Sequence, residues 1–103
     1  MLFIEFAAFT EDVVKLLTDE QYWALQEFLA DRPRSGVVIQ GTGGLRKLRW
    51  AAGGGGKRGG VRVVYHYAAE QSQIRMILIY RKGMKDDLSM KEKADLKRIT
   101  AEW

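Results

Sequence analysis

The sequence predicts one α+β domain, with a mainly antiparallel sheet and helices packed on one of its faces. Its 103 residues are enough for a single domain, and a 47% share of hydrophobic residues is typical of a folded chain. A short strand pattern is followed by two helix patterns, then by three β-rich segments and a last helix pattern. The predicted order is therefore β-α-α-β-β-β-α over residues 1–103, without a linker or an internal repeat.

The first third of the chain reads as one strand and two helices. Residues 2–6 (LFIEF) are apolar except for one glutamate, which predicts a short strand. Thr10 is a candidate N-cap for a first helix that ends near residue 17. Thr18 and Gln21 match a capping box, which predicts a second helix reaching about Asp31.

Pro33 and Gly36 are expected to end the second helix and to turn the chain towards the sheet. Three strands are then predicted, at residues 45–51, 61–67 and 73–80. Alternation along the middle strand divides its side chains between two faces. One face receives Val61, Val63, Tyr65 and Tyr67, and the other receives Arg62, Val64 and His66.

The C-terminal segment carries a second capping-box pattern, formed by Ser89 and Glu92. It predicts a helix from there towards the end of the chain, with Leu96, Ile99 and Trp103 on one stripe.

Charge is distributed unevenly along the chain, whose formal net charge is +4. Residues 1–40 hold seven acids and three bases, and residues 86–103 hold five acids and four bases. Between them, residues 41–85 hold one acid, Glu70, and ten bases: Arg46, Lys47, Arg49, Lys57, Arg58, Arg62, Arg75, Arg81, Lys82 and Lys85. A basic block interleaved with strand sequence favours a phosphate-rich partner.

Several classes of protein are disfavoured by composition. The chain has no cysteine, which excludes disulfides, thiolate metal sites and a cysteine nucleophile. The first ten residues carry a glutamate and no basic leader, and no apolar run is long enough to cross a bilayer. We therefore expect a cytoplasmic protein that does not bind membranes.

Common catalytic motifs are missing. The single histidine, His66, cannot form a histidine-rich metal cluster, and we expect it to pack in the sheet. Asp86 and Asp87 fit the entry to the last helix better than a metal site. The glycine-rich stretch 53–60 lacks the spacing of a phosphate-binding loop, because Lys57 is followed by Arg58 and then by a strand.

Strand alternation brings four basic residues together. Lys47 and Arg49 are two residues apart and therefore share a face. Arg62 joins that face if the two strands form a hairpin, and Lys82 emerges at the end of the last strand. Four aromatic residues are interleaved with these cations, and for most of them we favour a place in the core: Trp50, Tyr65, Tyr67 and Tyr80.

Such a cluster is chemically sufficient for RNA cleavage. RNA carries its own nucleophile, the 2′-hydroxyl, so a protein has to align it, stabilise the phosphorane and protonate the leaving oxygen. Arginine and lysine stabilise the developing charge, and a lysine crowded by other cations can transfer a proton.

Three stretches together resemble one family of proteins. They are GTGGLRKLRWA (41–51), GKRGGVRVVYHY (56–67) and IYRKGMKDDLS (79–89), supported by FTEDV and QEFLA nearer the start. In this order and spacing they resemble the HigB-type branch of the RelE/ParE toxins of type II toxin–antitoxin systems. The resemblance implies a microbial-ribonuclease-like fold, and cleavage of translated messenger RNA on the ribosome without a metal or an organic cofactor. It also implies a cognate antitoxin as partner, and contact with DNA only through that antitoxin.

The resemblance also suggests roles for individual residues. Arg62 matches the family's phosphate-binding catalytic arginine, Lys82 the lysine after the last strand, and Lys47 and Arg49 the paired cations of the second strand. RNA contacts are expected from Arg46, Lys57, Arg58, Lys85 and Tyr65. Gly83 and Ser89 stand where the family has a further arginine and a tyrosine.

Two alternatives to the ribonuclease remain open at this point. A ParE-like protein shares the fold but inhibits DNA gyrase, which does not require the basic cluster. The departures at Gly83 and Ser89 keep the other alternative open, a catalytically weakened module that binds RNA or antitoxin.

Overall fold

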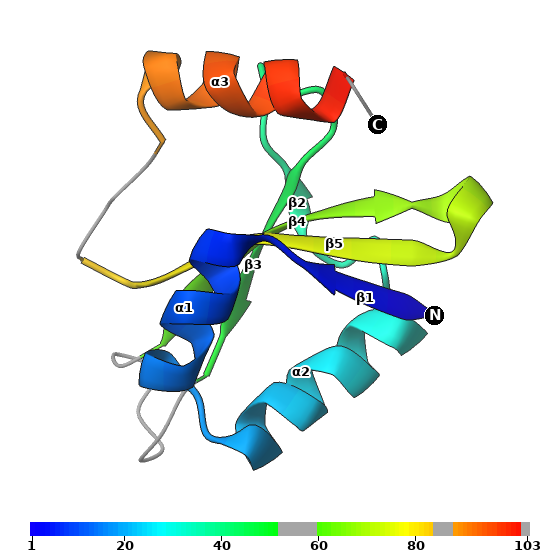
Figure 1. Ribbon diagram of the computed structural model, residues 1–103, viewed down its shortest axis with the longest axis vertical. Coiled ribbons are helices and arrows are strands. Elements are labelled where there is room, and N and C mark those ends of the chain that lie inside the picture. Colours follow the sequence, from blue (N-terminus) through cyan, green and yellow to red (C-terminus); the bar gives the residue numbers. More distant parts are fainter. Residues whose placement is uncertain (52–59, 84–87, 102–103) are drawn as a thin grey trace.

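A computed structural model of the chain describes residues 1–51, 60–83 and 88–101 (Figure 1). Five strands, three α-helices and one short 3₁₀ helix are formed in these ranges. In chain order they are β1 (Leu2–Glu5), α1 (Ala7–Leu16), α2 (Asp19–Asp31), β2 (Val37–Val38), β3 (Arg46–Trp50), β4 (Val61–Ala68), η2 (Ala69–Gln71), β5 (Gln73–Arg81) and α3 (Met90–Ala101). The α+β class is thus confirmed, with the two-residue strand β2 as an addition to the predicted order.

The strands form a single sheet in the order β1-β5-β4-β3-β2. β1 pairs with β5 in parallel, and the other three pairings are antiparallel. A bulge interrupts the β4–β5 pairing, because Val64 lies opposite Leu78 whereas Tyr65 lies opposite Met76. The extra residue, Ile77, sends its side chain to the same face as Leu78.

One face of the sheet is covered by α1 and α2, and we call it the helix-pair face. Each helix buries two residues one turn apart, which are Phe9 and Val13 in α1 and Leu25 and Leu29 in α2. They pack on side chains from β3, β4 and β5: Leu48, Val61, Val63, Tyr65, Ile74, Met76 and Ile79. The predicted alternation along β4 is therefore confirmed.

The opposite face, which carries Arg62, Val64 and His66, is called the basic face. Its core consists of Ile39, Leu45, Val64, Ile77, Leu88 and Leu96, and Leu96 belongs to α3. Figure 1 shows α3 apart from the α1–α2 pair. The prediction that all helices pack on one face was therefore wrong, because the apolar stripe of α3 covers residues that α1 and α2 cannot reach.

Both predicted capping boxes are formed. Thr18 Oγ1 accepts a hydrogen bond from the Gln21 amide at 3.1 Å, and the Gln21 side chain accepts one from the Thr18 amide at 2.8 Å. Ser89 and Glu92 make the same reciprocal pair at the start of α3. These contacts satisfy amides that the first turn of a helix leaves without a partner.

The first helix starts earlier than predicted. Its N-cap is Phe6, and Thr10 lies inside the helix and does not cap it. The Thr10 hydroxyl instead donates to Glu5 Oε1 at 2.6 Å, while the Tyr22 hydroxyl donates to Glu5 Oε2 at 2.6 Å. Burial and this carboxylate raise the pKa of Tyr22 above its ordinary value. One glutamate thus joins β1, α1 and α2.

Among residues 1–51, 60–83 and 88–101, no helix has the length and apolar character that a membrane span requires.

Candidate nucleic-acid interface

The register of the sheet gathers three of the four predicted catalytic cations around the fourth, Arg62. Arg49 on β3 lies directly opposite Arg62 on β4, and such partners have their β-carbons about 5 Å apart. Lys47 lies opposite Val64, two residues along, and is therefore a diagonal neighbour of Arg62. The Lys82 amide donates to the Gly60 carbonyl at 3.1 Å, which extends the β4–β5 ladder beyond the Val61–Arg81 pair. By alternation, Lys82 is the other diagonal neighbour of Arg62.

We call Lys47, Arg49, Arg62 and Lys82 the cationic cluster. Its members differ in exposure, since Arg49 and Lys82 are exposed whereas Lys47 and Arg62 are half-buried. Arg62 makes one long hydrogen bond, from Nη1 to the Val61 carbonyl at 3.4 Å. Arg49 makes no hydrogen bond or ion pair with the residues described here. The guanidinium of Arg49 is thus free to bind an anion.

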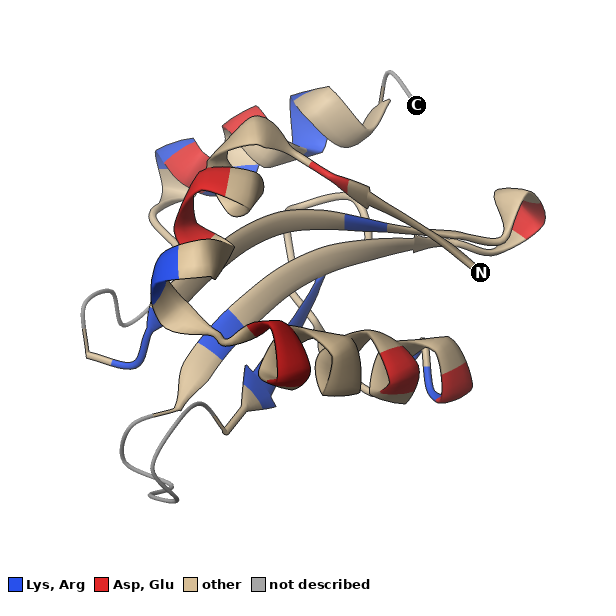
Figure 2. Cartoon of the chain, turned by 60° about the horizontal axis from the view of Figure 1, so that its bottom comes forward, with Lys and Arg blue, Asp and Glu red and all other residues tan. Residues whose placement is uncertain are grey.

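Acidic side chains are absent from the strands that carry the cationic cluster. Neither β3, β4 nor β5 contains an aspartate or a glutamate. Figure 2 shows blue segments on the central strands, and red segments mainly on the helices and at the β4–β5 turn. Like charges directly across a sheet destabilise it, so the Arg49–Arg62 pair costs stability when no anion is bound. The strands of the cluster therefore concentrate positive charge, which favours an anion as ligand.

Arg46 lies on the other side of β3, which corrects its predicted RNA contact. It pairs with Tyr65 and shares the side of Leu48 and Trp50. Its Nη1 donates to the carbonyl oxygens of Arg34 at 3.1 Å and Gly36 at 2.8 Å. The guanidinium of Arg46 thus holds the turn between α2 and β2.

Tyr65 is fully buried, so the expectation that its ring contacts RNA is also wrong. Its hydroxyl donates to the Pro33 carbonyl at 2.8 Å and accepts from the Gly36 amide at 2.9 Å. The approach is so close that a β-carbon on Gly36 would lie 2.9 Å from the Tyr65 ring. Tyr65 and Arg46 together fix the turn at residues 33–36.

The other aromatic residues divide between the faces. Trp50 packs against Phe28 on the helix-pair face, with ring centroids 5.3 Å apart, and Tyr67 lies below the Arg34 guanidinium at 5.0 Å. Tyr80 lies directly opposite Arg62 on the basic face, where it packs against the core of that face. A place in the core is thus confirmed for Tyr65, while Trp50, Tyr67 and Tyr80 are partly buried and pack against the core of their face.

His66 shares the basic face with the cationic cluster but lies at a distance from it. Four strand residues separate it from Arg62, a span of about 13 Å. Its Nδ1 is buried, and burial followed by the charge of Arg75 lowers the pKa of the imidazole. A phosphate held at Arg62 is therefore beyond the direct reach of His66.

Three of the predicted RNA contacts, Lys57, Arg58 and Lys85, lie outside the described residues, as do Asp86 and Asp87. Within the described ranges, no group of three or more histidine, cysteine, aspartate or glutamate side chains is placed to hold a metal ion.

Two further basic residues lie on the same side of the sheet, and the sequence pattern did not single them out. Lys93 and Lys97 of α3 are one helical turn apart, and their side chains lie beside the glycine turn at residues 41–44. The i, i+4 spacing was visible in the sequence, but the packing of α3 on that turn was not.

No model of a known protein family matches the chain.

Proposed function

We propose that the protein is the toxin of a type II toxin–antitoxin system, of the HigB-like branch of the RelE/ParE superfamily. Its activity is ribosome-dependent cleavage of translated messenger RNA, which inhibits translation and growth. The observation that carries the proposal is the Arg62-centred cluster, in which a directly opposed arginine and two diagonal lysines meet on strands without carboxylates.

The reaction needs no nucleophile from the protein. The 2′-hydroxyl of the nucleotide attacks the adjacent phosphorus, and the bond from phosphorus to the 5′-oxygen breaks. The proton lost by the 2′-oxygen is balanced by one gained at the 5′-oxygen. The products are a 2′,3′-cyclic phosphate and a 5′-hydroxyl end.

The four cations have complementary roles in this step. Arg62 and Arg49 bind the non-bridging phosphate oxygens, and charge-assisted hydrogen bonds from the two guanidinium groups stabilise the phosphorane. Lys82, at the edge of the cluster, protonates the leaving 5′-oxygen, and Lys47 holds the phosphate on the other side. In this proposal the central arginine interacts with the oxygens on which negative charge develops.

The partners follow from the same proposal. The ribosome presents the message in the translated frame, and binding of a cognate antitoxin inhibits the toxin. An acidic or amphipathic antitoxin segment complements a basic surface, and DNA is contacted only through the antitoxin.

The proposal is tested in a reconstituted translation reaction with a defined message. Message ends are mapped by primer extension for the wild-type protein, for Arg62→Ala and for Arg32→Ala. The last variant removes an arginine from the end of α2, on the opposite side of the sheet, and serves as a charge-matched control. We expect cuts only with ribosomes present, lost in Arg62→Ala and kept in Arg32→Ala. An intact message with unimpaired translation would reject the proposal.

One observation favours a second candidate, a module that binds RNA but cleaves it weakly. The only histidine of the chain, His66, is too far from Arg62 to transfer a proton to a phosphate held there. Proton transfer then depends on lysine, which is a weaker acid at neutral pH. Binding of messenger RNA without cuts would support this candidate, and gyrase inhibition by the purified protein would support the ParE-like alternative.

A further inference from the structure

A glycine-rich turn at residues 41–44 precedes β3 and lies on the side of the sheet that α3 covers. The turn is closed by a hydrogen bond from the Ile39 amide to the Leu45 carbonyl at 2.8 Å. Inside it, the fully buried Thr42 donates its hydroxyl to the Ile39 carbonyl at 2.6 Å and accepts from the Leu45 amide at 3.2 Å. Thr42 therefore points inward, and the outer rim of the turn is glycine backbone.

Three glycines make up the exposed backbone of this rim. Gly41, Gly43 and Gly44 have φ angles of +81°, +77° and +104°, and all three are exposed. At Gly43 a β-carbon would lie 2.8 Å from Thr100 Oγ1, so only glycine allows α3 to approach. None of these three amides donates a hydrogen bond within the described part of the chain. Exposed amides in a turn with left-handed residues are donors suited to an anion.

Two lysines of α3 flank the same rim. A β-carbon on Gly41 would lie 3.9 Å from Lys93 Cδ, and one on Gly43 would lie 3.7 Å from Lys97 Cγ. The end of α3 is fixed here, because the Thr100 hydroxyl donates to the Thr42 carbonyl at 3.2 Å. The lysine stems therefore run along the turn.

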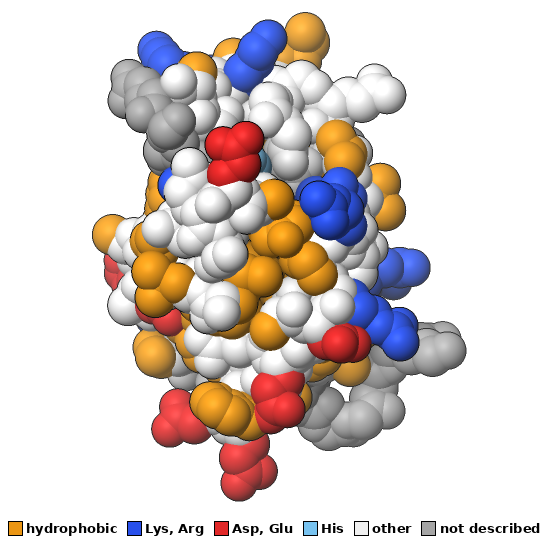
Figure 3. All heavy atoms as spheres, turned by 90° about the vertical axis from the view of Figure 1, so that its right-hand side faces the viewer, with side chains coloured by type: hydrophobic (Ala, Val, Ile, Leu, Met, Phe, Trp, Pro, Cys, Tyr) orange, Lys and Arg blue, Asp and Glu red, His pale blue; other side chains and the backbone are white. Residues whose placement is uncertain are grey.

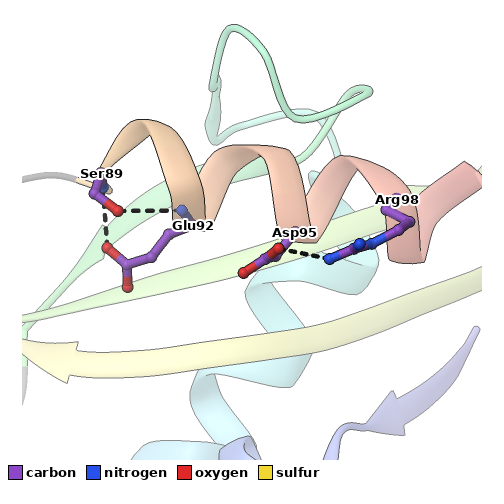
Figure 4. A network of polar contacts seen from close by, with 4 residues as sticks. All are labelled: Ser89, Glu92, Asp95 and Arg98. Atoms are coloured by element: carbon purple, nitrogen blue, oxygen red, sulfur yellow. Dashed lines mark hydrogen bonds and ion pairs between the residues drawn. The ribbon is translucent and has the colours of Figure 1, made fainter.

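The acidic residues of α3 do not neutralise these lysines. Glu92 accepts a hydrogen bond from the Ser89 amide at 2.9 Å, and Asp95 pairs with Arg98 at 2.6 Å (Figure 4). Neither Lys93 nor Lys97 forms an ion pair with another described residue. Figure 3 shows basic side chains at the top of this face and along its right edge, and most acidic side chains in its lower part. The rim is thus bordered by two lysines that have no carboxylate partner among the described residues.

We propose that the glycine turn, Lys93 and Lys97 form a second phosphate-binding site for the single-stranded RNA substrate. The inference rests on the proposed ribonuclease function and extends its substrate path. β3 connects the two sites, because Leu45 at the edge of the turn is four residues, or about 13 Å, from Arg49. An RNA strand held at the cationic cluster therefore reaches the turn with a phosphate further along the same strand.

The test is the salt dependence of binding to a short, fluorescently labelled oligouridylate, measured by anisotropy without ribosomes. Lys93→Gln/Lys97→Gln removes both cations of the site. Lys91→Gln/Arg98→Gln changes the charge equally on the same helix, and Lys91 lies about 200° around the helix from Lys93. We expect the first variant to bind more weakly, with the slope of log K against log salt smaller by about 1.4. The control should retain the wild-type slope.

Three outcomes would overturn the inference: equal losses in both double variants, no loss in the lysine pair, or no binding by the wild-type protein at low salt. Circular dichroism of each variant separates lost binding from lost folding. Failure of the proposed function is recognised separately. If the wild type cuts messages and the lysine pair has no effect on binding, only the inference fails. If the lysine pair weakens binding but no message is cut, the phosphate site stands and the ribonuclease proposal fails.

Discussion

The two faces of the sheet are built from the same strands but satisfy their polar groups in opposite ways. On the helix-pair face, Tyr65 and Arg46 are bound to backbone atoms of the turn at residues 33–36. On the basic face, Arg49 lies opposite Arg62 without a carboxylate on either strand. Alternation along β3 places Arg46 and Lys47 on these different faces.

The difference indicates that one face stabilises the fold and the other is suited to bind a ligand. Buried hydrogen bonds and a packed apolar core stabilise the helix-pair face. Opposed like charges reduce stability on the basic face, and a site that sacrifices stability in this way is typical of ligand binding. Substitutions on one face should therefore affect stability, and those on the other should affect RNA cleavage.

The largest effect is expected from Arg62→Ala. Removing one preorganised donor to a developing oxyanion typically lowers a rate by about 10²–10³-fold. We expect a loss of that size in single-turnover cleavage on programmed ribosomes, with a melting temperature no lower than that of the wild type. A drop in melting temperature with the cleavage rate preserved would reverse the assignment of the faces.

Leu25→Ala tests the helix-pair face. Leu25 is fully buried between α2 and the sheet, and its truncation leaves a cavity. The free energy of unfolding should fall by about 3 kcal/mol in urea titrations. The cleavage rate of the folded fraction should be unchanged, and Ala24→Gly on the exposed side of α2 provides a milder control.

Tyr65→Phe removes a hydroxyl but keeps the ring. The buried Gly36 amide loses its acceptor, so the free energy of unfolding should fall by about 2 kcal/mol. RNA affinity, measured by anisotropy, should not change. Weaker RNA binding with unaltered stability would restore the RNA contact that the structure argues against.

Arg49→Gln should raise the free energy of unfolding, by about 0.5 kcal/mol, because it removes a like charge opposite Arg62. The same change should weaken RNA binding and lower the salt slope. Thermal melts at low and high salt are the measurement, and the stabilisation should shrink at high salt. Destabilisation by Arg49→Gln would mean that Arg49 has a structural role.

His66 gives the smallest expected effect. Its pKa in the folded protein lies below the ordinary value of 6.5, so the unfolded chain binds its proton first on acidification. The stabilising contribution of neutral His66 is complete above pH 6.5 and is lost as the pH falls through the lowered pKa of the folded state. Urea titrations below pH 6.5 should show this loss in the wild type and a flatter dependence in His66→Gln.

Local patterns in the sequence were sufficient for most of the elements. Both capping boxes, at Thr18 and Ser89, depend on contacts three residues apart, and the two faces of β4 depend on alternation alone. The start of α1 was misplaced, because the Thr10 hydroxyl binds Glu5, which precedes the helix. The location of α3 could not be predicted, since it depends on contacts between Leu96 and distant residues such as Val64.

The residues of the candidate site also divide into those that local patterns predict and those that depend on distant contacts. Lys47, Arg49 and Arg62 were grouped correctly, because strand alternation and a hairpin register determine which side chains share a face. Arg46 and Tyr65 were wrongly predicted to contact RNA. The backbone groups of residues 33–36 that bind them lie ten or more residues away in the sequence, so no local pattern revealed these contacts. A basic or aromatic residue in a strand does not itself reveal whether a distant turn will occupy it.

The most direct test of the central claim, RNA cleavage through the 2′-hydroxyl, uses a message with a single 2′-O-methyl group at the nucleotide where primer extension maps the cut. The cationic cluster supplies charge and no nucleophile, so we predict that this one modification abolishes the cut on programmed ribosomes. The unmodified message should yield a fragment with a 5′-hydroxyl end. Cleavage at the same bond in the methylated message would contradict the claim, because the attacking oxygen would then come from elsewhere.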